Sequence, residues 1–207
     1  MIGYYNYTVI LTYIGTISGF LGISYICDGR ITAALICLMV AGFCDMFDGK
    51  VASMRERTRQ EKSFGIQIDS LSDLICFGAL PSMIVLHSTT VSKYISVPVC
   101  CIYLLCGLIR LAWFNVDEEE RQSTEVGSRK TYMGLPITTS ALLVPLFFGL
   151  GSLTKLPVNA ISPWFLLCIA IAFITPFKLR KPGTIGKILM VVAGIAIVTA
   201  VVIGVRK

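Results

Sequence analysis

Four aspartates lie in two pairs within stretches that are otherwise apolar enough to cross a membrane. Asp45 and Asp48 are three residues apart, and Asp69 and Asp73 are four apart, so on helices each pair would share one face. Two such helices packed together would gather four carboxylates, whose mutual repulsion calls for a positive charge between them. Hard divalent cations prefer oxygen ligands and fit this set best. The sequence therefore predicts a metal site formed by these aspartates.

Small residues accompany the acids. Gly49, Ala52 and Gly65 would let a ligand come close to the backbone. The alternative is that the acids cap helices or face water. Ionisable residues inside a membrane are costly and are functional candidates by default, and two helical pairs flanked by small residues favour a functional site.

Seven residues at ordered spacings carry a resemblance to a known family: Asp45-x2-Asp48-Gly49-x2-Ala52, followed by Gly65-x3-Asp69-x3-Asp73. This order resembles the signature of the CDP-alcohol phosphotransferases. These integral membrane enzymes transfer a phosphoryl-linked group from a CDP-activated donor to an alcohol and release CMP. The resemblance implies two Mg²⁺ or Mn²⁺ ions, with Asp45, Asp48 and Asp69 as ligands. It places Asp73 near the second ion as the general base, and it implies a homodimer.

Two departures from the family pattern concern the nucleotide. The family usually has Arg directly after the alanine, where this chain has Ser53, with Arg55 two positions later. The gap between Ala52 and Gly65 is also about three residues longer than usual. The expected nucleotide-binding residues are Gly49, Ala52, Ser53, Arg55 and Gly65.

The composition is that of a polytopic membrane protein. Of 207 residues, 55% are hydrophobic and only 14% are charged, and the mean hydropathy is +0.78, which is too apolar for an ordinary soluble domain. We expect one domain over residues 1–207. No basic residue precedes Arg30, so the first apolar stretch reads as a retained span and not as a cleaved signal peptide. The net charge of +6 comes without a soluble basic face, so we expect no nucleic-acid partner.

The fold expected is an all-α bundle of membrane-spanning helices. A span needs about 20 apolar residues, and the candidate spans run over about 7–27, 31–53, 65–88, 94–115, 135–153, 159–177 and 184–205. The family resemblance implies a six-helix core, to which 184–205 could be an addition. The connections are short, except for the polar segment from Asp117 to Thr131.

Basic residues are unevenly distributed between the two sides of these spans. With the N-terminus inside, eleven Lys and Arg fall on the cytoplasmic side and five on the other, and the positive-inside rule then sets the orientation. It places both acidic pairs near the cytoplasmic ends of their spans, so the active site would face the cytoplasm.

The remaining chemistry-bearing residue types give weaker signals. The eight cysteines lie almost wholly in apolar runs without zinc-type spacing, and we expect reduced packing residues. His87 is the one histidine, at a span end with no evident ligand partner, and we interpret it as structural or interfacial.

A second group of residues concerns the acceptor. Arg110 either extends to the interface from its span or binds a carboxylate or phosphate with its planar fork of donors. The run from Arg110 to Asn115, with Phe77-Gly78 before it and Gly134-Leu-Pro136 after it, resembles the branch of the family that uses serine. That branch commonly has Arg where this chain has Trp113. Arg129 and Lys130 are either a solvated positive-inside flank or further acceptor or lipid-phosphate ligands.

The resemblance implies transfer of a phosphatidyl group, or its archaeal ether-lipid equivalent, from CDP-diacylglycerol or an ether analogue to L-serine. Glycerol 3-phosphate and inositol phosphate stay open as acceptors. A cation channel or metal transporter would also explain intramembrane acids. It would not explain the regular small residues or the concentration of all four acids at one membrane face.

Overall fold

The computed structural model describes residues 3–5, 7–52, 54–124, 131–154 and 156–180, together with Gly186 and Gly194. The expected seventh span, 184–205, lies outside the described residues apart from those two glycines. The elements are η1 (Tyr7–Val9), α1 (Ile10–Cys27), α2 (Ile31–Ala52), α3 (Arg59–Asp73), η2 (Leu74–Ala79), α4 (Leu80–Ser88), α5 (Lys93–Thr124), β1 (Thr131–Met133), η3 (Ile137–Thr139), α6 (Ser140–Thr154), α7 (Val158–Ile174) and β2 (Lys178–Arg180).

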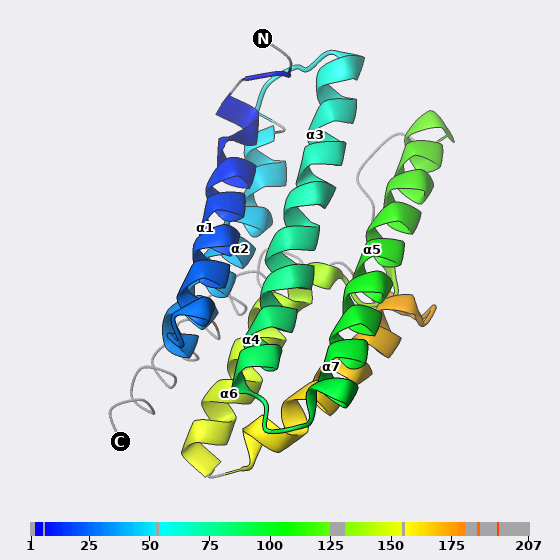
Figure 1. The fold of residues 1–207 in the computed structure, drawn as a ribbon. Coiled ribbons are helices and arrows are strands. Elements are labelled where there is room, and N and C mark those ends of the chain that lie inside the picture. Colours follow the sequence, from blue (N-terminus) through cyan, green and yellow to red (C-terminus); the bar gives the residue numbers. More distant parts are fainter. Residues whose placement is uncertain are drawn as a thin grey trace.

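The described elements form the bundle of membrane helices that the sequence predicts (Figure 1). Among the residues that the structure describes, five helical stretches are long and apolar enough to span a membrane, and α7 is a shorter apolar helix. One of the five runs continuously from Arg59 to Ser88 through α3, η2 and α4. The all-α polytopic fold is therefore confirmed, and the six helical stretches correspond to the first six predicted spans.

Two helices extend beyond their predicted spans. The third span begins at Arg59 because Thr58 caps the helix: its side chain accepts from the Glu61 N–H, and the Glu61 carboxylate accepts from the Thr58 N–H, which is a capping box. Helix α5 continues to Thr124, where a long polar connection was predicted. Arg121 Nε donates to Glu118 Oε2 at 3.0 Å, and such an i, i+3 pair supports a polar helix end.

The helices pack around one core. Its most deeply buried members come from six of the described helices: Ile26, Leu38, Leu80, Tyr103, Val144 and Leu166. Helix α1 lies mainly against α2, and α5 lies against α7 (Figure 1). In lipid, such contacts stabilise through close packing and interhelical hydrogen bonds, because the surrounding tails are as apolar as the core.

A polar seam fixes α3 against α1. Thr16 Oγ1 lies 2.7 Å from Ser72 Oγ, and Cys76 Sγ donates to the Gly15 carbonyl at 3.3 Å. Ser72 and Asp73 are neighbours on the helix, so this seam limits the rotation of α3 about its axis. It therefore helps to direct the acidic face of α3. All eight cysteines are free.

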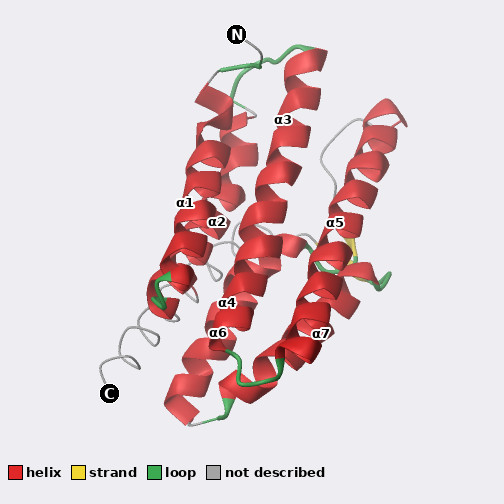
Figure 2. Cartoon of the chain, viewed as in Figure 1, coloured by secondary structure: helices red, strands yellow, loops and turns green. Residues whose placement is uncertain are grey.

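Two short strands were not predicted. β1 and β2 pair antiparallel, with Tyr132 opposite Leu179 (yellow in Figure 2). The turn after β1 needs Gly134, whose φ is +71° and whose N–H donates to Phe177 O at 2.7 Å. A Cβ there would lie 3.0 Å from Phe173 O. The strands and this turn join the chain after α5 to the chain after α7.

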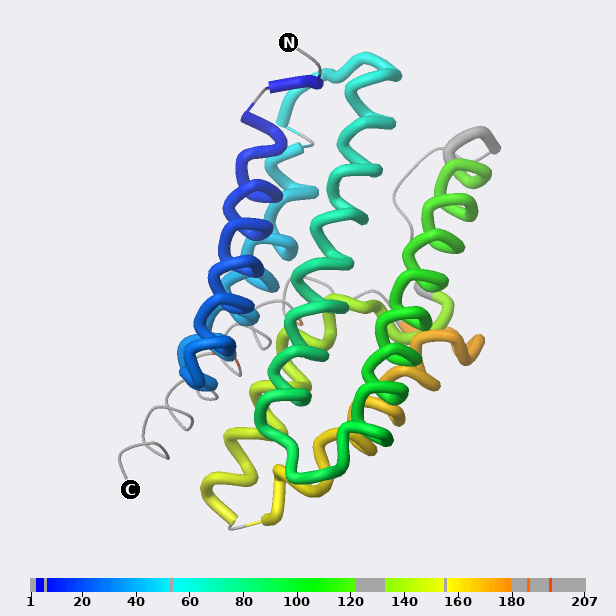
Figure 3. The backbone as a smooth tube through the Cα atoms, in the orientation of Figure 1, coloured from blue at the N-terminus to red at the C-terminus, as the bar shows by residue number. Residues whose placement is uncertain are grey.

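The first described residues lie beside the connection between α2 and α3 (Figure 3). Tyr4 Oη donates to Gln60 Oε1 at 2.8 Å, and the Tyr4 ring meets the Phe64 ring edge-on at 5.5 Å. Asp45, Asp48 and Asp69 lie toward this end of the bundle, and we call it the acidic end.

Candidate active site

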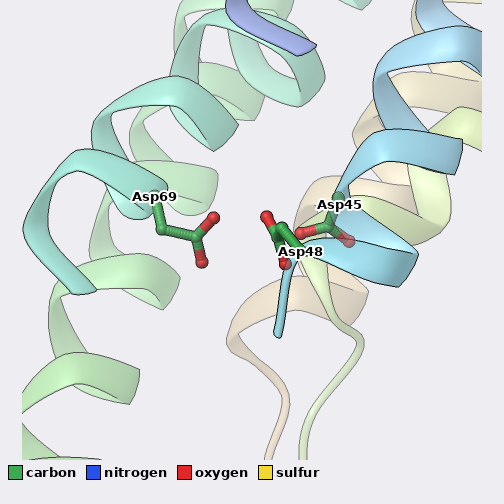
Figure 4. Close-up of side chains that lie close together, drawn as sticks. All are labelled: Asp45, Asp48 and Asp69. Carbon is green, nitrogen blue, oxygen red and sulfur yellow. The ribbon is translucent and has the colours of Figure 1, made fainter. Parts of the chain in front are cut away.

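Asp45 and Asp48 on α2 and Asp69 on α3 form the acid cluster (Figure 4). One carboxylate oxygen from each lies within 4.8 Å of the others. All three side chains are half-buried. The side chains point toward one another across the space between the two helices, so the predicted meeting of the two helical faces is present in the fold.

The acid cluster has the ligand chemistry of a divalent-cation site. Two unit charges 4.8 Å apart repel by about 3 kcal/mol at an effective dielectric constant of about 20. Repulsion of this size favours a positive charge between the carboxylates. Three half-buried carboxylates from two rigid helices fit a hard cation that takes oxygen ligands, and this is the one such group found among the described residues.

Asp73 is set apart from the other three. It lies one helical turn beyond Asp69 on the same face of α3 and is only 8% exposed. It is not a member of the group whose oxygens converge within 4.8 Å, although Asp45, Asp69 and Asp48 are the charges that face it. The four predicted metal ligands therefore divide into three that converge and one that lies deeper in the bundle.

The glycines beside the acids differ in their surroundings. A Cβ on Gly49 would meet nothing within 4 Å, so the backbone after Asp48 is open to a ligand. Ala52 is half-buried at the end of α2. Ser53 lies outside the described residues, and its predicted role stays a prediction.

Arg55 and Arg57 follow Ala52 in the chain, and each makes a different contact. Arg55 Nη2 lies 3.8 Å from Glu61 Oε1, so the predicted nucleotide ligand contacts the capping-box partner of Thr58. Arg57 Nη1 instead lies 3.2 Å from the position that a Cβ on Gly65 would take. Gly65, Asp69 and Asp73 share one helical face, which places the Arg57 guanidinium one turn from the acid cluster. No motif position distinguishes Arg57 from the neighbouring basic residues, so its contact with Gly65 could not be predicted from the sequence.

Asn115 contacts the acidic helix. Its amide faces Ser70, with Ser70 Oγ donating to Oδ1 at 3.0 Å and accepting from Nδ2 at 2.9 Å. Ser70 directly follows Asp69, so this pair ties α5 to α3 beside the acid cluster. The predicted acceptor residue is thus brought to the site, with its amide engaged by a neighbouring helix.

Arg110 is buried, with 5% exposure, so it does not extend to the interface in the manner of a snorkelling side chain. Its Nε donates to Leu135 O at 3.3 Å, and its guanidinium carbon lies 5.5 and 5.6 Å from the ring centroids of Trp113 and Phe114. Arg110 therefore holds the turn at Gly134. Arg129 and Lys130 lie outside the described residues, directly before β1. His87 Nδ1 lies 3.0 Å from Met83 O, in keeping with a structural interpretation.

Comparison with known proteins places these features in a family. The chain is 29% identical over 177 residues to archaetidylserine synthase of Methanothermobacter thermautotrophicus, covering 86% of this chain and 70% of that protein. It is 35% identical over 108 residues to the CDP-diacylglycerol–serine O-phosphatidyltransferase of Saccharomyces cerevisiae, covering 51% of this chain and 38% of the yeast protein. For the enzyme of that name from Bacillus subtilis the identity is 29% over 134 residues, covering 64% and 70%. The chain thus spans about 70% of the archaeal and Bacillus relatives and well under half of the yeast protein. The profile of the CDP-alcohol phosphatidyltransferase family matches residues 5–205, and the chain, an integral membrane transferase with its acids at the signature spacings, belongs to that family.

Proposed function

We propose that this protein transfers a phosphatidyl group, or its archaeal ether-lipid equivalent, from a CDP-linked lipid to the hydroxyl of L-serine and releases CMP. The convergence of Asp45, Asp48 and Asp69 from two helices, with Asp73 buried one turn beyond, carries the proposal. Relatives named as serine transferases and as an archaetidylserine synthase support it.

Asp45, Asp48 and Asp69 would hold two divalent cations, Mg²⁺ or Mn²⁺. When bound, such ions would neutralise the charge that develops on the phosphate oxygens. The contribution of the protein is a rigid arrangement of ligands: two acids are fixed on α2 and the third on α3, which the Thr16–Ser72 contact anchors. The arrangement is therefore present before a donor arrives, which lowers the entropic cost of binding.

We assign to Asp73 the role of general base for the serine hydroxyl. It would accept the serine hydroxyl proton while the serine oxygen forms a bond to the lipid-bearing phosphorus. The bond from that phosphorus to the bridging oxygen breaks, and the electron pair leaves with CMP. A carboxylate is a weak base for an alcohol, so precise positioning must supply part of the rate enhancement.

The nucleotide end of the donor is assigned to the open backbone at Gly49 and to the Arg57 guanidinium beside Gly65. Arginine provides paired donors suited to phosphate oxygens. Ala52, Ser53 and Arg55 remain predicted neighbours of the nucleotide.

The acceptor end is assigned to α5. Arg110 and Asn115 would meet the serine carboxylate or the donor phosphate, and Arg129 and Lys130 would add positive charge. We also propose that the acidic end faces the cytoplasm, as the positive-inside rule predicts, and that the protein is a homodimer, as the family resemblance implies.

A competition assay between acceptors tests the proposal. The purified protein in detergent receives CDP-diacylglycerol or its ether-linked analogue with Mg²⁺, and an equal mixture of L-serine, glycerol 3-phosphate and inositol phosphate. We expect CMP and the serine lipid in equal amounts, with serine preferred at least about tenfold, which corresponds to 1.4 kcal/mol between acceptors. A preference for glycerol 3-phosphate or inositol phosphate would leave the proposed transfer reaction in place and identify a different acceptor.

The transporter alternative makes the opposite prediction. A channel or metal transporter would move Mg²⁺ or Mn²⁺ across sealed proteoliposomes without a CDP-lipid and would release no CMP. Metal flux without CMP release would therefore replace the enzyme assignment.

A further inference from the structure

The helix that carries Asp69 and Asp73 changes its geometry directly after Asp73. It widens into the π-helical turn η2, Leu74–Ala79, in which the Leu80 N–H donates to Ile75 O five residues back. π-Helical turns are rare within α-helices and occur frequently at functional sites. The wide turn must be held by its surroundings, since an α-helix is the more favourable default.

Tyr103 supplies a donor that the turn lacks. Pro81 has no N–H, so the carbonyl four residues earlier, Phe77 O, has no α-helical donor. The Tyr103 hydroxyl donates to Phe77 O at 2.6 Å from a fully buried position on α5. A carbonyl can only accept, so the Tyr103 proton is committed to this bond. In the 2.7 Å contact between Tyr103 Oη and Ser140 Oγ, Ser140 is therefore the donor.

These bonds form a directed chain across three helical elements. Ser140 on α6 donates to Tyr103 on α5, which donates to Phe77 in η2. Ser140 begins the helix that follows the Gly134 turn, the turn that Arg110 holds through Leu135 O. The chain thus connects the acceptor-side segment with the turn that directly follows Asp73.

The geometry of a helix shows why this turn matters for Asp73. Each residue of an α-helix advances by about 100°. If η2 relaxed to an α-helix, the register between Asp73 and the residues after the turn would change by about one residue. Leu80 and Ile84 are fully buried on α4, and they resist rotation because protein interiors are close-packed. The rotation would therefore fall on α3 and turn Asp73, together with Asp69, away from Asp45 and Asp48 on α2.

We propose that Tyr103, supported by Ser140, is a positioning residue for the transfer reaction: its hydroxyl holds the π-helical turn that sets Asp73 against the acid cluster. This inference rests on the proposed role of Asp73. Tyr103 touches neither substrate nor metal and acts only through the backbone of η2.

Tyr103→Phe tests the inference because it removes one hydroxyl and keeps the ring against Phe173, 5.4 Å away. A displacement of about 1 Å can cost up to about 10²-fold in rate, and we expect kcat to fall about tenfold. Because Asp69 lies on the same helix and would turn with Asp73, half-saturating Mg²⁺ should rise as well, so kcat is compared at saturating Mg²⁺. Tyr25→Phe is the matched control: its ring packs under Arg30, far from the acidic end, and kcat should be unchanged.

The same substitution in an Asp73→Asn background separates positioning from general structural support. If Tyr103 acts through Asp73, Tyr103→Phe lowers kcat no further in that background. Ser140→Ala should show a smaller loss of kcat, because the bond from Tyr103 to Phe77 O is kept. If Tyr103→Phe does not fold, the kcat of Ser140→Ala tests the inference instead.

Two results would overturn the inference about Tyr103 while leaving the proposed role of Asp73 in place. One is an unchanged kcat per folded enzyme with only a lower melting temperature, which would make Tyr103 merely structural. The other is an equal fractional loss in the wild-type and Asp73→Asn backgrounds. Full turnover by Asp73→Asn itself would overturn the premise instead, so the two failures are distinguishable.

Discussion

The acid cluster depends on charge at three positions, because an amide in place of any one carboxylate removes a negative ligand from a shared site. We predict that Asp45→Asn, Asp48→Asn and Asp69→Asn each lose turnover through weaker metal binding. Even outer-shell partners of a metal site are worth about 10- to 100-fold in metal affinity, so each variant should require at least that much more Mg²⁺. Turnover measured across a Mg²⁺ titration checks this.

Asp28→Asn provides the control for charge removal. Asp28 is exposed in the turn between α1 and α2, at the opposite end of the bundle from the acid cluster, and its Mg²⁺ requirement should match the wild type. Full activity of the three cluster variants at limiting Mg²⁺ would show that the metal assignment is wrong.

Arg55 and Arg57 are two residues apart, yet we predict different effects on the nucleotide. Arg57→Ala should weaken inhibition by CMP about tenfold, the scale of one charge-assisted hydrogen bond. Arg55→Ala should change it little, because Arg55 is paired with Glu61 and its side chain is 44% exposed. Inhibition constants for CMP measured on both variants check the prediction, and the reverse order of effects would assign the nucleotide to Arg55.

At the scale of elements, Arg110 joins α5 to the turn before α6, and lysine cannot reproduce both of its interactions. A lysine ammonium lacks the planar fork that bonds Leu135 O while lying near the Trp113 and Phe114 rings. We predict that Arg110→Lys raises the apparent KM for serine and lowers kcat, with at least a tenfold loss of kcat/KM, equal to about 1.4 kcal/mol. Steady-state kinetics with serine and donor varied in turn check this.

Arg121→Lys is the matched control for that substitution. Arg121 pairs with Glu118 on its own helix, so the conservative change should alter neither KM. Unchanged affinities of the Arg110→Lys variant for both substrates would confine Arg110 to a structural role at the Gly134 turn.

The helices were predictable from the sequence because their apolar runs are long. The first five spans appear in nearly the predicted places, and their type follows from the need to satisfy every backbone group within lipid. The end of α5 was not predicted, since Asp117–Thr124 is polar and its helix depends on local pairs such as Glu118–Arg121. β1 and β2 are three residues each, which is too short for a periodic signal.

The site was predictable to the extent that it lies on helix faces. The i, i+3 spacing of Asp45 and Asp48 was enough to place both on one side of α2, and Asp69 on α3 meets them. The deeper place of Asp73, the contact of Arg57 with Gly65 and the bond from Arg110 to Leu135 O all depend on tertiary packing. The π-helical turn after Asp73 leaves no pattern in the sequence, although Pro81 marks the carbonyl that Tyr103 satisfies.

At the scale of the whole molecule, the orientation in the membrane decides which side supplies the substrates. We predict that sealed inside-out vesicles use externally added serine and release CMP outside, whereas sealed right-side-out vesicles do not until detergent opens them. The reason is the predicted distribution of Lys and Arg: eleven fall on the side of the acidic end and five on the opposite side. The positive-inside rule assigns the more basic side to the cytoplasm. CMP release measured before and after detergent checks this, and activity confined to right-side-out vesicles would reverse the orientation.

The whole assembly serves to hold a buried carboxylate where an acceptor hydroxyl meets an activated phosphorus. Asp73→Asn keeps the shape of the side chain and one acceptor oxygen, and it removes the negative charge and the basic site. Because Asp73 lies apart from the three converging ligands, the variant should still bind Mg²⁺ and the CDP-lipid.

The most direct test is therefore serine transfer by Asp73→Asn at saturating Mg²⁺, measured together with donor binding. We predict normal donor binding and transfer at least about 10²-fold slower, the usual scale for losing general-base catalysis. Near-normal transfer under these conditions would contradict the base role of Asp73, and slow transfer with an equal loss of donor binding would make Asp73 a metal ligand only.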